Sequence, residues 1–244
     1  MKKKLIFFGC SHTHTSLWKC FDVDNIKIIN KSMSGNSNQK IFDDVYTYVN
    51  SNEYSSTDIL IIQYTYTNRL WWPNKLDGND YSFHSFDTKN SPIYYLNKFC
   101  KEELLSLYTN FIKYFWNYDT AFRTQKMNID FLKSYLETKK VNFIHWMYSD
   151  GGNTQEWNTG FKTFWQKYDD KSIFEELNLF NIDGFYRIQD WAIKNKFTDK
   201  SDHIGEAGNY ILSIEMCKIL KNKFNLSITP IEIYNNEKRN TKIL

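Results

Sequence analysis

The feature that most constrains the fold of this chain is the alternation of short apolar runs with longer segments of helical periodicity. The apolar runs are Leu5–Phe8, Ile26–Ile29, Asp58–Ile62, Val141–Trp146 and the weaker Phe185–Ile188. The segments with helical spacing are Gln39–Val49, Ile93–Trp116, Ile129–Leu136 and Glu206–Phe224. Short runs that are apolar throughout are typical of strands buried on both faces of a parallel sheet, and strands that alternate with helices pair through right-handed crossovers. The pattern therefore predicts an α/β sandwich with a mainly parallel, five-stranded sheet.

The length of 244 residues fits one large domain or two small ones, and no repeat, low-complexity tract or linker divides the chain. We expect a single domain over residues 1–228 and a polar C-terminal tail over residues 229–244. Pro, Asn, Asp and Gly are frequent in Trp71–Ser91, which predicts a long loop at about residues 69–92. Loops of that length in compact domains are often lids or binding loops.

Charge and hydropathy argue against two classes of partner. Lys and Arg number 31 and Asp and Glu 28, and the resulting net charge of +3 is too small to indicate nucleic acid as the main partner. No window approaches the roughly 18 uninterrupted apolar residues of a membrane-spanning helix. The basic start Met1–Lys4 leads into an apolar run, Leu5–Phe8, that is shorter than the roughly 7–15 residues of a secretory signal. The sequence therefore predicts a cytoplasmic protein whose first apolar run is a strand.

Aromatic residues make up 18% of the chain, as 8 Trp, 17 Tyr and 19 Phe. Such a content is expected of a bulky core with Tyr and Trp at half-buried positions, and it also suits a cleft whose rings stack on sugar faces. The four Cys, at positions 10, 20, 100 and 217, match no zinc spacing and are expected to be reduced, buried thiols. His12-Thr13-His14 offers a pair of imidazoles, but the spacing shows no third ligand, so we expect neither a metal nor another cofactor.

Ligands of open α/β sheets bind at the carboxyl ends of the strands, so the residues that follow each apolar run are the most informative. These segments are Gly9–Thr15, Asn30–Ser37 and Gln63–Arg69, and the segment Asp199–Gly208 opens the last helix. All four are expected to meet at one edge of the sheet. Together they offer a Ser in a turn of small residues, a Gly, an Asn and a late Asp/His pair, which is a set suited to acyl transfer.

Acyl transfer by a Ser needs a base, because a hydroxyl is a poor nucleophile until its proton is removed. Ser11 is the candidate nucleophile and His203 the candidate base. A carboxylate behind the imidazole would fix its tautomer and stabilise the imidazolium. Asp199 and Asp202 are both candidates for that acid, and the sequence leaves the choice between them open.

The tetrahedral intermediate of acyl transfer needs hydrogen-bond donors for its oxyanion. The candidate donors are the Ser11 backbone N–H, the Gly35 N–H and the Asn68 side-chain amide. Side chains near these segments are candidates for binding the substrate, through ring stacking or through a positive charge. They are His12, Arg69, Trp71 and Trp72.

These blocks, in this order, resemble those of the SGNH (GDSL-like) hydrolase family. Gly9-Cys10-Ser11 is similar to the first block, usually Gly-Asp-Ser, and Asn30–Gly35 is similar to the second, which supplies an oxyanion-hole Gly. Asp58–Asn68 is similar to the third, where a strand leads into an oxyanion-hole Asn, and His203–Gly208 to the last, which supplies the catalytic His and its acid. The resemblance covers the chain up to about residue 220. It implies a flavodoxin-like three-layer α/β/α sandwich and a serine esterase.

The chain departs from the family's pattern in three blocks. Cys10 stands where the first block usually has Asp. The third block usually reads Gly-x-Asn-Asp, whereas this chain has Gln63–Asn68, and a strict alignment to the strand end puts Thr65 rather than Asn68 in the donor position. In the last block the acid usually stands two or three residues before the His, whereas the two candidates stand one and four residues before His203.

Three functions are compatible with these blocks. The expected one is a serine esterase or deacetylase that works through a Ser-His-Asp acyl-enzyme mechanism, and the aromatic content favours an O-acylated carbohydrate as its substrate. A dry, aromatic-lined acceptor site would instead suit an O-acetyltransferase that moves an acetyl group onto a glycan. The altered blocks would suit a catalytically silent module that binds a glycan or a protein, with the rings that follow the third block serving only to anchor a loop.

Overall fold

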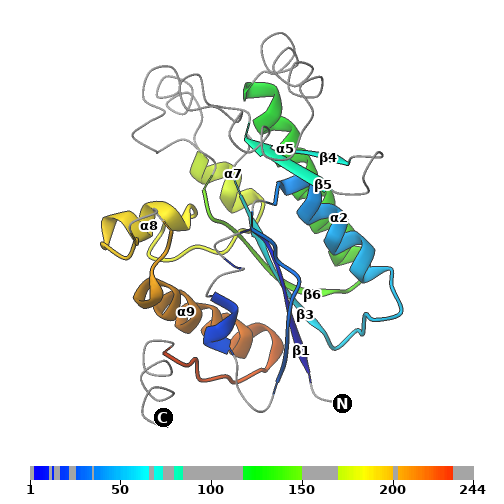
Figure 1. Ribbon diagram of the computed structural model, residues 1–244. Helices are drawn as coiled ribbons and strands as arrows, with labels where there is room; N and C mark the ends of the chain where they lie inside the picture. Colours follow the sequence, from blue (N-terminus) through cyan, green and yellow to red (C-terminus); the bar gives the residue numbers. More distant parts are fainter. Residues whose placement is uncertain are drawn as a thin grey trace, which may run out of the picture.

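The parallel sheet that the sequence predicts is present in the computed structural model. Its strands are β1 (Lys4–Phe8), β2 (Lys27–Asn30), β3 (Ile59–Tyr64) and β6 (Asn142–Met147). Their order is β2-β1-β3-β6, and every pairing is parallel (Figure 1). The structure describes residues 3–10, 13, 17–21, 26–34, 36–65, 69–73, 80–84, 118–149, 170–199 and 203–232. Each strand lies within two residues of a predicted apolar run, so those four predictions are confirmed.

The fifth strand predicted at Phe185–Ile188 is replaced by a single bridge and a helix. Arg187 forms one parallel bridge with Met147 of β6, and α8 (Ile188–Lys194) begins at the next residue. The helical spacing of α8 buries Ile188, Trp191 and Ala192 against the core on one face of the sheet. The bridge still lies at the edge of the sheet where a fifth strand would stand. The order along the sheet is therefore that of the flavodoxin-like fold.

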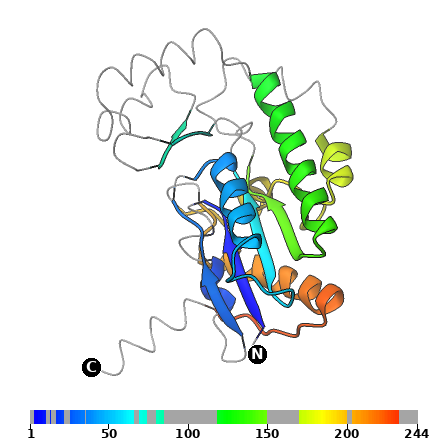
Figure 2. The same cartoon turned by 90° about the vertical axis from the view of Figure 1, so that its right-hand side faces the viewer.

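Alternate side chains of each strand point to opposite faces of the sheet and build two cores. Leu5 and Phe7 belong to one core, and Ile6 and Phe8 to the other. Helical elements cover both faces. The first is covered by η1 (Leu17–Phe21), α8 and α9 (Glu206–Phe224), and the second by α2 (Asn38–Val49), α5 (Tyr118–Thr138) and α7 (Asp170–Glu176). Figures 1 and 2 show the resulting three-layer α/β/α sandwich.

Helical periodicity predicted α9 with the bounds that the structure has, and α2 to within one residue. The predicted helix Ile129–Leu136 lies inside the longer α5, and the predicted helix Ile93–Trp116 lies outside the described residues. α2 begins after Ser37, whose hydroxyl accepts the Lys40 N–H at 3.3 Å as an N-terminal cap. Among the helices in the described ranges, none has both the length and the apolar character needed to cross a membrane.

A hairpin follows β3 in the region where the sequence predicted a loop. β4 (Arg69–Pro73) pairs antiparallel with β5 (Asp80–His84), so that Arg69 stands opposite His84. β4 lies beside α2, and Figure 2 shows the hairpin (teal) beyond the end of α2 that follows β2. The loop predicted at about residues 69–92 is therefore corrected in these two stretches, where aromatic residues favour strands over a loop.

A buried carboxylate ties segments together at the amino end of β3. Asp58 Oδ2 accepts the Tyr48 hydroxyl at 2.7 Å, the Ser55 N–H at 2.8 Å and the Lys4 ammonium at 3.2 Å. Asp58 is fully buried, and a buried charge is tolerated only with such donors. This network holds the amino ends of β1 and β3 against the last turns of α2. The carboxyl ends of the strands, which lie at the opposite edge, carry a different set of polar residues.

Candidate active site

The turn after β1 is held by one amide side chain from the end of β3. Gln63 Oε1 accepts the Cys10 N–H at 3.4 Å, the Thr13 N–H at 3.1 Å and the Thr13 hydroxyl at 2.5 Å. Gln63 Nε2 donates to Cys10 Sγ at 2.9 Å. The Thr13 N–H also donates to the Cys10 carbonyl at 3.2 Å, which closes the turn. Ser11 and His12 lie between these anchored residues but outside the described residues.

A glycine before the turn allows this approach. A Cβ on Gly9 would lie 2.8 Å from Gln63 Oε1, 2.9 Å from Gln63 Cβ and 2.9 Å from Thr13 Oγ1. Contacts below 3.0 Å with a side chain held by four hydrogen bonds leave no room for adjustment. The Gly9 of the first block is therefore required by the packing of Gln63, and both ends of the turn depend on that packing.

The second block is attached to the same turn. The Gly9 carbonyl accepts the Met33 N–H and the Asn36 side-chain amide, each at 3.2 Å. Asn36 also donates its N–H to the Met33 carbonyl at 3.2 Å, and it is buried. The predicted oxyanion donor Gly35 lies inside this loop but outside the described residues. The structure thus brings the described residues on either side of Gly35 onto the turn that contains Ser11.

The third block contains Thr65, whose main chain is held by side chains from two helices. Asn38, at the start of α2, accepts the Thr65 N–H at 2.8 Å and donates to the Thr65 carbonyl at 2.9 Å. Gln125 of α5 donates to the same carbonyl at 3.4 Å. The Thr65 N–H is therefore engaged, and among the described residues the buried Thr65 hydroxyl has no hydrogen-bond partner. Asn68, the other candidate for the third-block donor, lies outside the described residues.

The last block forms a closed loop before α9. The Asp199 N–H donates to the His203 carbonyl at 2.8 Å, and the His203 N–H donates to Asp199 Oδ1 at 3.1 Å. A bridge between Thr198 and Ile204 continues this pairing outward. One carboxylate oxygen of Asp199 thus holds the main chain of His203, which is half-buried. Asp202 lies outside the described residues.

The loop of His203 is connected to the carboxyl end of the sheet through α8. The Gln189 N–H donates to the carbonyl of Tyr148, the residue after β6, at 2.9 Å. The Phe197 N–H then donates to the Ala192 carbonyl at 2.8 Å, and the Gly205 N–H donates to the Phe197 carbonyl at 2.6 Å. This series of bonds ties the last block to the residue that follows β6.

A second glycine sets the position of α9 against that loop. A Cβ on Gly208 would lie 2.6 Å from Ile204 Cγ2 and 2.8 Å from Phe197 Cβ. Gly208 of the last block therefore lets the first turn of α9 pack directly on Phe197 and Ile204. The candidate substrate-binding residues Arg69, Trp71 and Trp72 belong to β4, whose backbone runs beside α2.

Sequence reasoning missed the polar side chains that build this edge of the sheet, namely Gln63, Asn36, Asn38 and Gln125. One signal for Gln63 is its place directly after a run of apolar residues, because a polar side chain at the end of a buried strand must find hydrogen bonds. Nothing in the sequence indicates which partner each would take. Within the ranges that the structure describes, no group of three His, Cys, Asp or Glu residues is placed to hold a metal ion.

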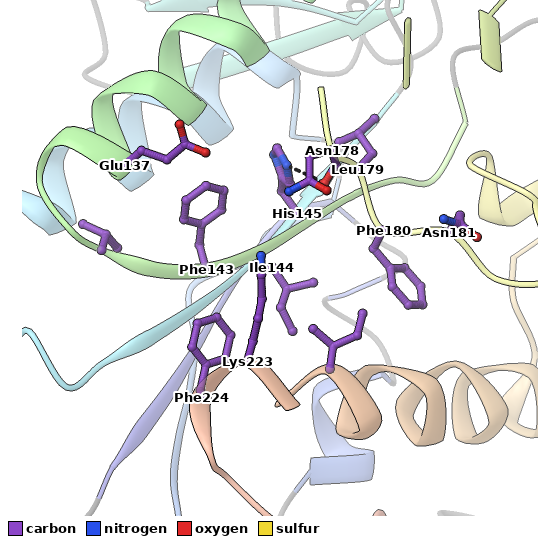
Figure 3. A pocket seen from close by; sticks show the side chains of 12 residues that line it. Glu137, Phe143, Ile144, His145, Asn178, Leu179, Phe180, Asn181, Lys223 and Phe224 are labelled. Carbon is purple, nitrogen blue, oxygen red and sulfur yellow. Dashed lines mark hydrogen bonds between the residues drawn. The ribbon is translucent and has the colours of Figure 1, made fainter. Parts of the chain in front are cut away.

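A pocket of about 410 Å³ lies beside the first half of β6, away from this edge (Figure 3). Its walls come from β6, the end of α5, residues 178–181 and the end of α9. Phe143, Phe180 and Phe224 give it an apolar lining, and Glu137 and Lys223 carry charges at its border. The pocket borders the amino half of the edge strand, so it is separate from the candidate active site.

The imidazole in this pocket is occupied on both nitrogens. His145 Nε2 lies 3.2 Å from the Asn178 carbonyl, which can only accept, so Nε2 carries the proton. Nδ1 of the neutral ring then accepts from the Tyr64 hydroxyl at 3.2 Å. Burial lowers the pKa of His145 to about 4, and the loss of solvation likewise raises the pKa of Tyr64. His145 is therefore a neutral structural histidine with no free nitrogen for acid–base catalysis.

The strand order and the two helical layers define a flavodoxin-like α/β/α sandwich whose polar edge lies at the carboxyl ends of the strands. Comparison with protein-family models and with curated proteins finds no match. A solved structure similar to this chain is a lipolytic protein of the G-D-S-L family from Veillonella parvula, with a TM-score of 0.49 and 14% identity over 92% of this chain and 100% of that one.

Two further solved structures are named as acetylxylan esterases. The enzyme AlAXEase has a TM-score of 0.46 and 12% identity over 89% of this chain and 99% of its own. A catalytic mutant of Axe2 from Geobacillus stearothermophilus has a TM-score of 0.43 and 16% identity over 88% of this chain and 92% of its own. At these identities the likeness concerns the course of the chain and not the roles of residues.

Proposed function

We propose that this protein is a serine esterase that removes acyl groups from an O-acylated carbohydrate, with Ser11 as nucleophile and His203 as general base. The observation that supports this most is the network of Gln63, which holds the main chain on both sides of residues 11 and 12 at the carboxyl end of β1. A misplacement of about 1 Å in an active site can cost about a hundredfold in rate. An anchored turn is what a serine nucleophile requires.

In the proposed reaction Ser11 Oγ attacks the carbonyl carbon of the ester while its proton passes to the His203 ring. The carbon–oxygen double bond opens to a tetrahedral intermediate. Its collapse breaks the bond to the alcohol, which leaves with the proton from the imidazolium. A water molecule then attacks the acyl-enzyme, gives its proton to His203, and releases the acid as Ser11 recovers its hydroxyl hydrogen.

The oxyanion is assigned to three donors: the Ser11 N–H, the Gly35 N–H and the Asn68 side-chain amide. Support for Gly35 comes from the attachment of the surrounding loop to the Gly9 carbonyl, directly beside the first turn. Thr65 stays the alternative to Asn68: Asn38 takes its N–H, so its buried hydroxyl is the group left to donate. Losing one such donor typically costs about 10²–10³ in rate.

Asp199 and Asp202 both stay candidates for the acid of the triad. Asp199 already has one oxygen on the His203 N–H, which gives it a positioning role whether or not it also contacts the ring. Substitution of each by Asn separates the two cases. The residue whose loss lowers kcat far more than the other, with the folded structure intact, is the triad acid.

The carbohydrate part of the proposal is supported by the aromatic content and by the position of β4. Arg69, Trp71 and Trp72 belong to a hairpin that lies beyond the end of α2, beside the ends of the strands (Figure 2). A strand that contains two Trp residues suits stacking on sugar faces, and one that contains an Arg suits an acidic group of the substrate.

The test is hydrolysis of p-nitrophenyl acetate and of an acetylated oligosaccharide by the wild type, Ser11→Ala and His203→Ala. Ser227→Ala, on an exposed residue that follows α9, is the matched control. We expect the first two variants to lose activity by several orders of magnitude and the control to keep it. A covalent label from a fluorophosphonate probe, located by peptide mass spectrometry, should fall on Ser11.

Three results would count against the proposal. Wild-type rates equal to the buffer blank on both substrates, with no label on Ser11, would indicate a silent binding module. Activity that survives Ser11→Ala would exclude Ser11 as the nucleophile. Faster transfer of acetyl to an added sugar than to water would replace the esterase by an acetyltransferase that uses the same site.

A further inference from the structure

We infer that Gln63 is a positioning residue of the reaction: its amide orients the turn of Ser11 and takes over a role that the residue at position 10 would otherwise fill. The inference rests on the proposed function. Position 10 departs from the SGNH pattern with Cys for Asp, and position 63 departs with Gln for Gly when the third block is aligned to the end of β3. In the structure these two side chains touch, since Gln63 Nε2 donates to Cys10 Sγ at 2.9 Å.

The physical reason lies in the N–H groups of the turn. An Asp at position 10 would stand three residues before Thr13, the spacing at which a short carboxylate accepts an N–H as a cap. A thiol is a weak acceptor, so this N–H, which already bonds to the Cys10 carbonyl at 3.2 Å, gains no strong side-chain acceptor from position 10. Gln63 Oε1 supplies one from β3, accepting the Thr13 N–H at 3.1 Å together with the Cys10 N–H at 3.4 Å. One oxygen therefore holds both sides of the two-residue segment that contains Ser11.

The amide is held in one orientation by its partners. Turning it over would aim the NH₂ group at two N–H donors and leave Cys10 Sγ facing an oxygen. Gln63 is fully buried, so no water can substitute for a lost bond at this point. The main chain on both sides of residues 11 and 12 is thus held by a side chain that is 53 residues from Cys10 and 50 from Thr13 in sequence.

Gln63 lies behind the turn and is fully buried, so it acts through Ser11 and not on the substrate. Its loss should therefore lower kcat and leave KM nearly unchanged, since the groups that bind the substrate remain. Gln63→Met keeps the length of the side chain but removes the acceptor. A displaced turn of this kind is expected to lower kcat by about a hundredfold.

The test compares Gln63→Met with three other kinds of variant. These are a conservative substitution at position 63, a double variant with the family's usual residues at positions 10 and 63, and a matched control. Gln63→Glu keeps an oxygen acceptor and should lie between Gln63→Met and the wild type. The double variant Cys10→Asp/Gln63→Gly should recover most of the kcat that Gln63→Gly loses alone, which is the signature of two coupled positions. Tyr48→Phe removes a buried hydrogen bond to Asp58 at the opposite, amino end of β3, and it should leave kcat unchanged.

Labelling of Cys10 by iodoacetamide, read from its peptide by mass spectrometry, shows whether Gln63 still covers this thiol. This readout does not depend on catalysis. Gln63→Met should speed this labelling, because the amide that covers the thiol is removed. Unchanged kcat and unchanged Cys10 labelling in Gln63→Met would overturn the inference, as would a double variant no better than Gln63→Gly. If the wild type hydrolyses neither substrate and Ser11 takes no label, the proposed function fails and the positioning role fails with it. Faster Cys10 labelling in Gln63→Met would then still show that Gln63 holds the turn after β1.

Discussion

The buried imidazole beside β6 makes the stability of this protein depend on pH in a way that can be calculated. His145 is 4% exposed and neutral, and burial lowers its pKa from 6.5 to about 4 in the folded state. The unfolded chain therefore binds the proton more tightly than the folded one, and protonation favours unfolding. The loss of stability caused by His145 is absent above pH 6.5 and grows as the pH falls from 6.5 towards 4.

The size of the effect follows from the two pKa values. One pKa unit corresponds to about 1.4 kcal/mol, so the full difference would lower the free energy of unfolding by about 3 kcal/mol below pH 4. At pH 4.5, where the folded-state ring is still mostly neutral, the loss should be about 2.5 kcal/mol. Total stabilities of domains are about 5–15 kcal/mol, so a loss of this size is large.

The assay is urea unfolding followed by tryptophan fluorescence, at pH 7.5 and at pH 4.5, for the wild type and His145→Gln. Gln is neutral at both pH values, and its amide can donate to the Asn178 carbonyl. Other groups titrate alike in both proteins and cancel in the difference. We expect the wild type to be the more stable at pH 7.5 and to lose about 2.5 kcal/mol relative to His145→Gln at pH 4.5.

Tyr64→Phe is the control, because it removes the hydroxyl that donates to the ring but leaves the imidazole able to titrate. It should lower stability at both pH values while keeping most of the pH dependence of the wild type. A stability difference between wild type and His145→Gln that is the same at pH 7.5 and pH 4.5 would refute the reasoning. It would mean that the ring is protonated in the fold or that water reaches it.

Three further changes test other parts of the structure. Gly208→Ala would place a Cβ 2.6 Å from Ile204 Cγ2, and we expect overpacking to cost about 1–3 kcal/mol in urea unfolding, with a loss of esterase rate from the displaced loop. Tyr48→Phe removes the 2.7 Å bond to the Asp58 carboxylate and should cost about 1.5–3 kcal/mol by the same measurement, whereas no loss would mean that water replaces the hydroxyl. Burial raises the pKa of the Cys217 thiol to about 12, so its peptide should take no iodoacetamide at pH 8 until urea unfolds the chain.

The strands and the last helix could be predicted because their signals are local. An apolar run such as Leu5–Phe8 is visible within a few residues, and β1 occupies it with one residue added. Glu206–Phe224 was predicted with the bounds of α9 because its apolar positions recur along the whole segment. α7 and α8 were missed because seven-residue helices are too short for their periodicity to stand out. The apolar run Phe185–Ile188 predicts a strand, but it forms only one bridge to β6 because α8 begins at Ile188.

The sequence predicts a candidate site at the carboxyl ends of the strands, but it does not predict the side chains that hold these turns in place. Ser11 and Gly35 were singled out from the residues that follow strands, and their flanking residues do meet at the end of β1. Gln63 was not recognised, since its partners at positions 10 and 13 are 53 and 50 residues away and no local pattern connects them. Hydrogen bonds of buried side chains are satisfied by whatever the packing brings near, which spacing alone does not reveal.

The amino-acid sequence by itself determined the class of fold and the edge of the sheet at which chemistry is expected, because hydrophobic periodicity and strand ends are properties of short segments. Tertiary structure alone decided that one amide holds the turn after β1, that Asn38 occupies the N–H of Thr65, and that Asp199 closes the loop of His203. Each of these depends on directional bonds between groups that only packing of the layers brings within 3.5 Å of each other.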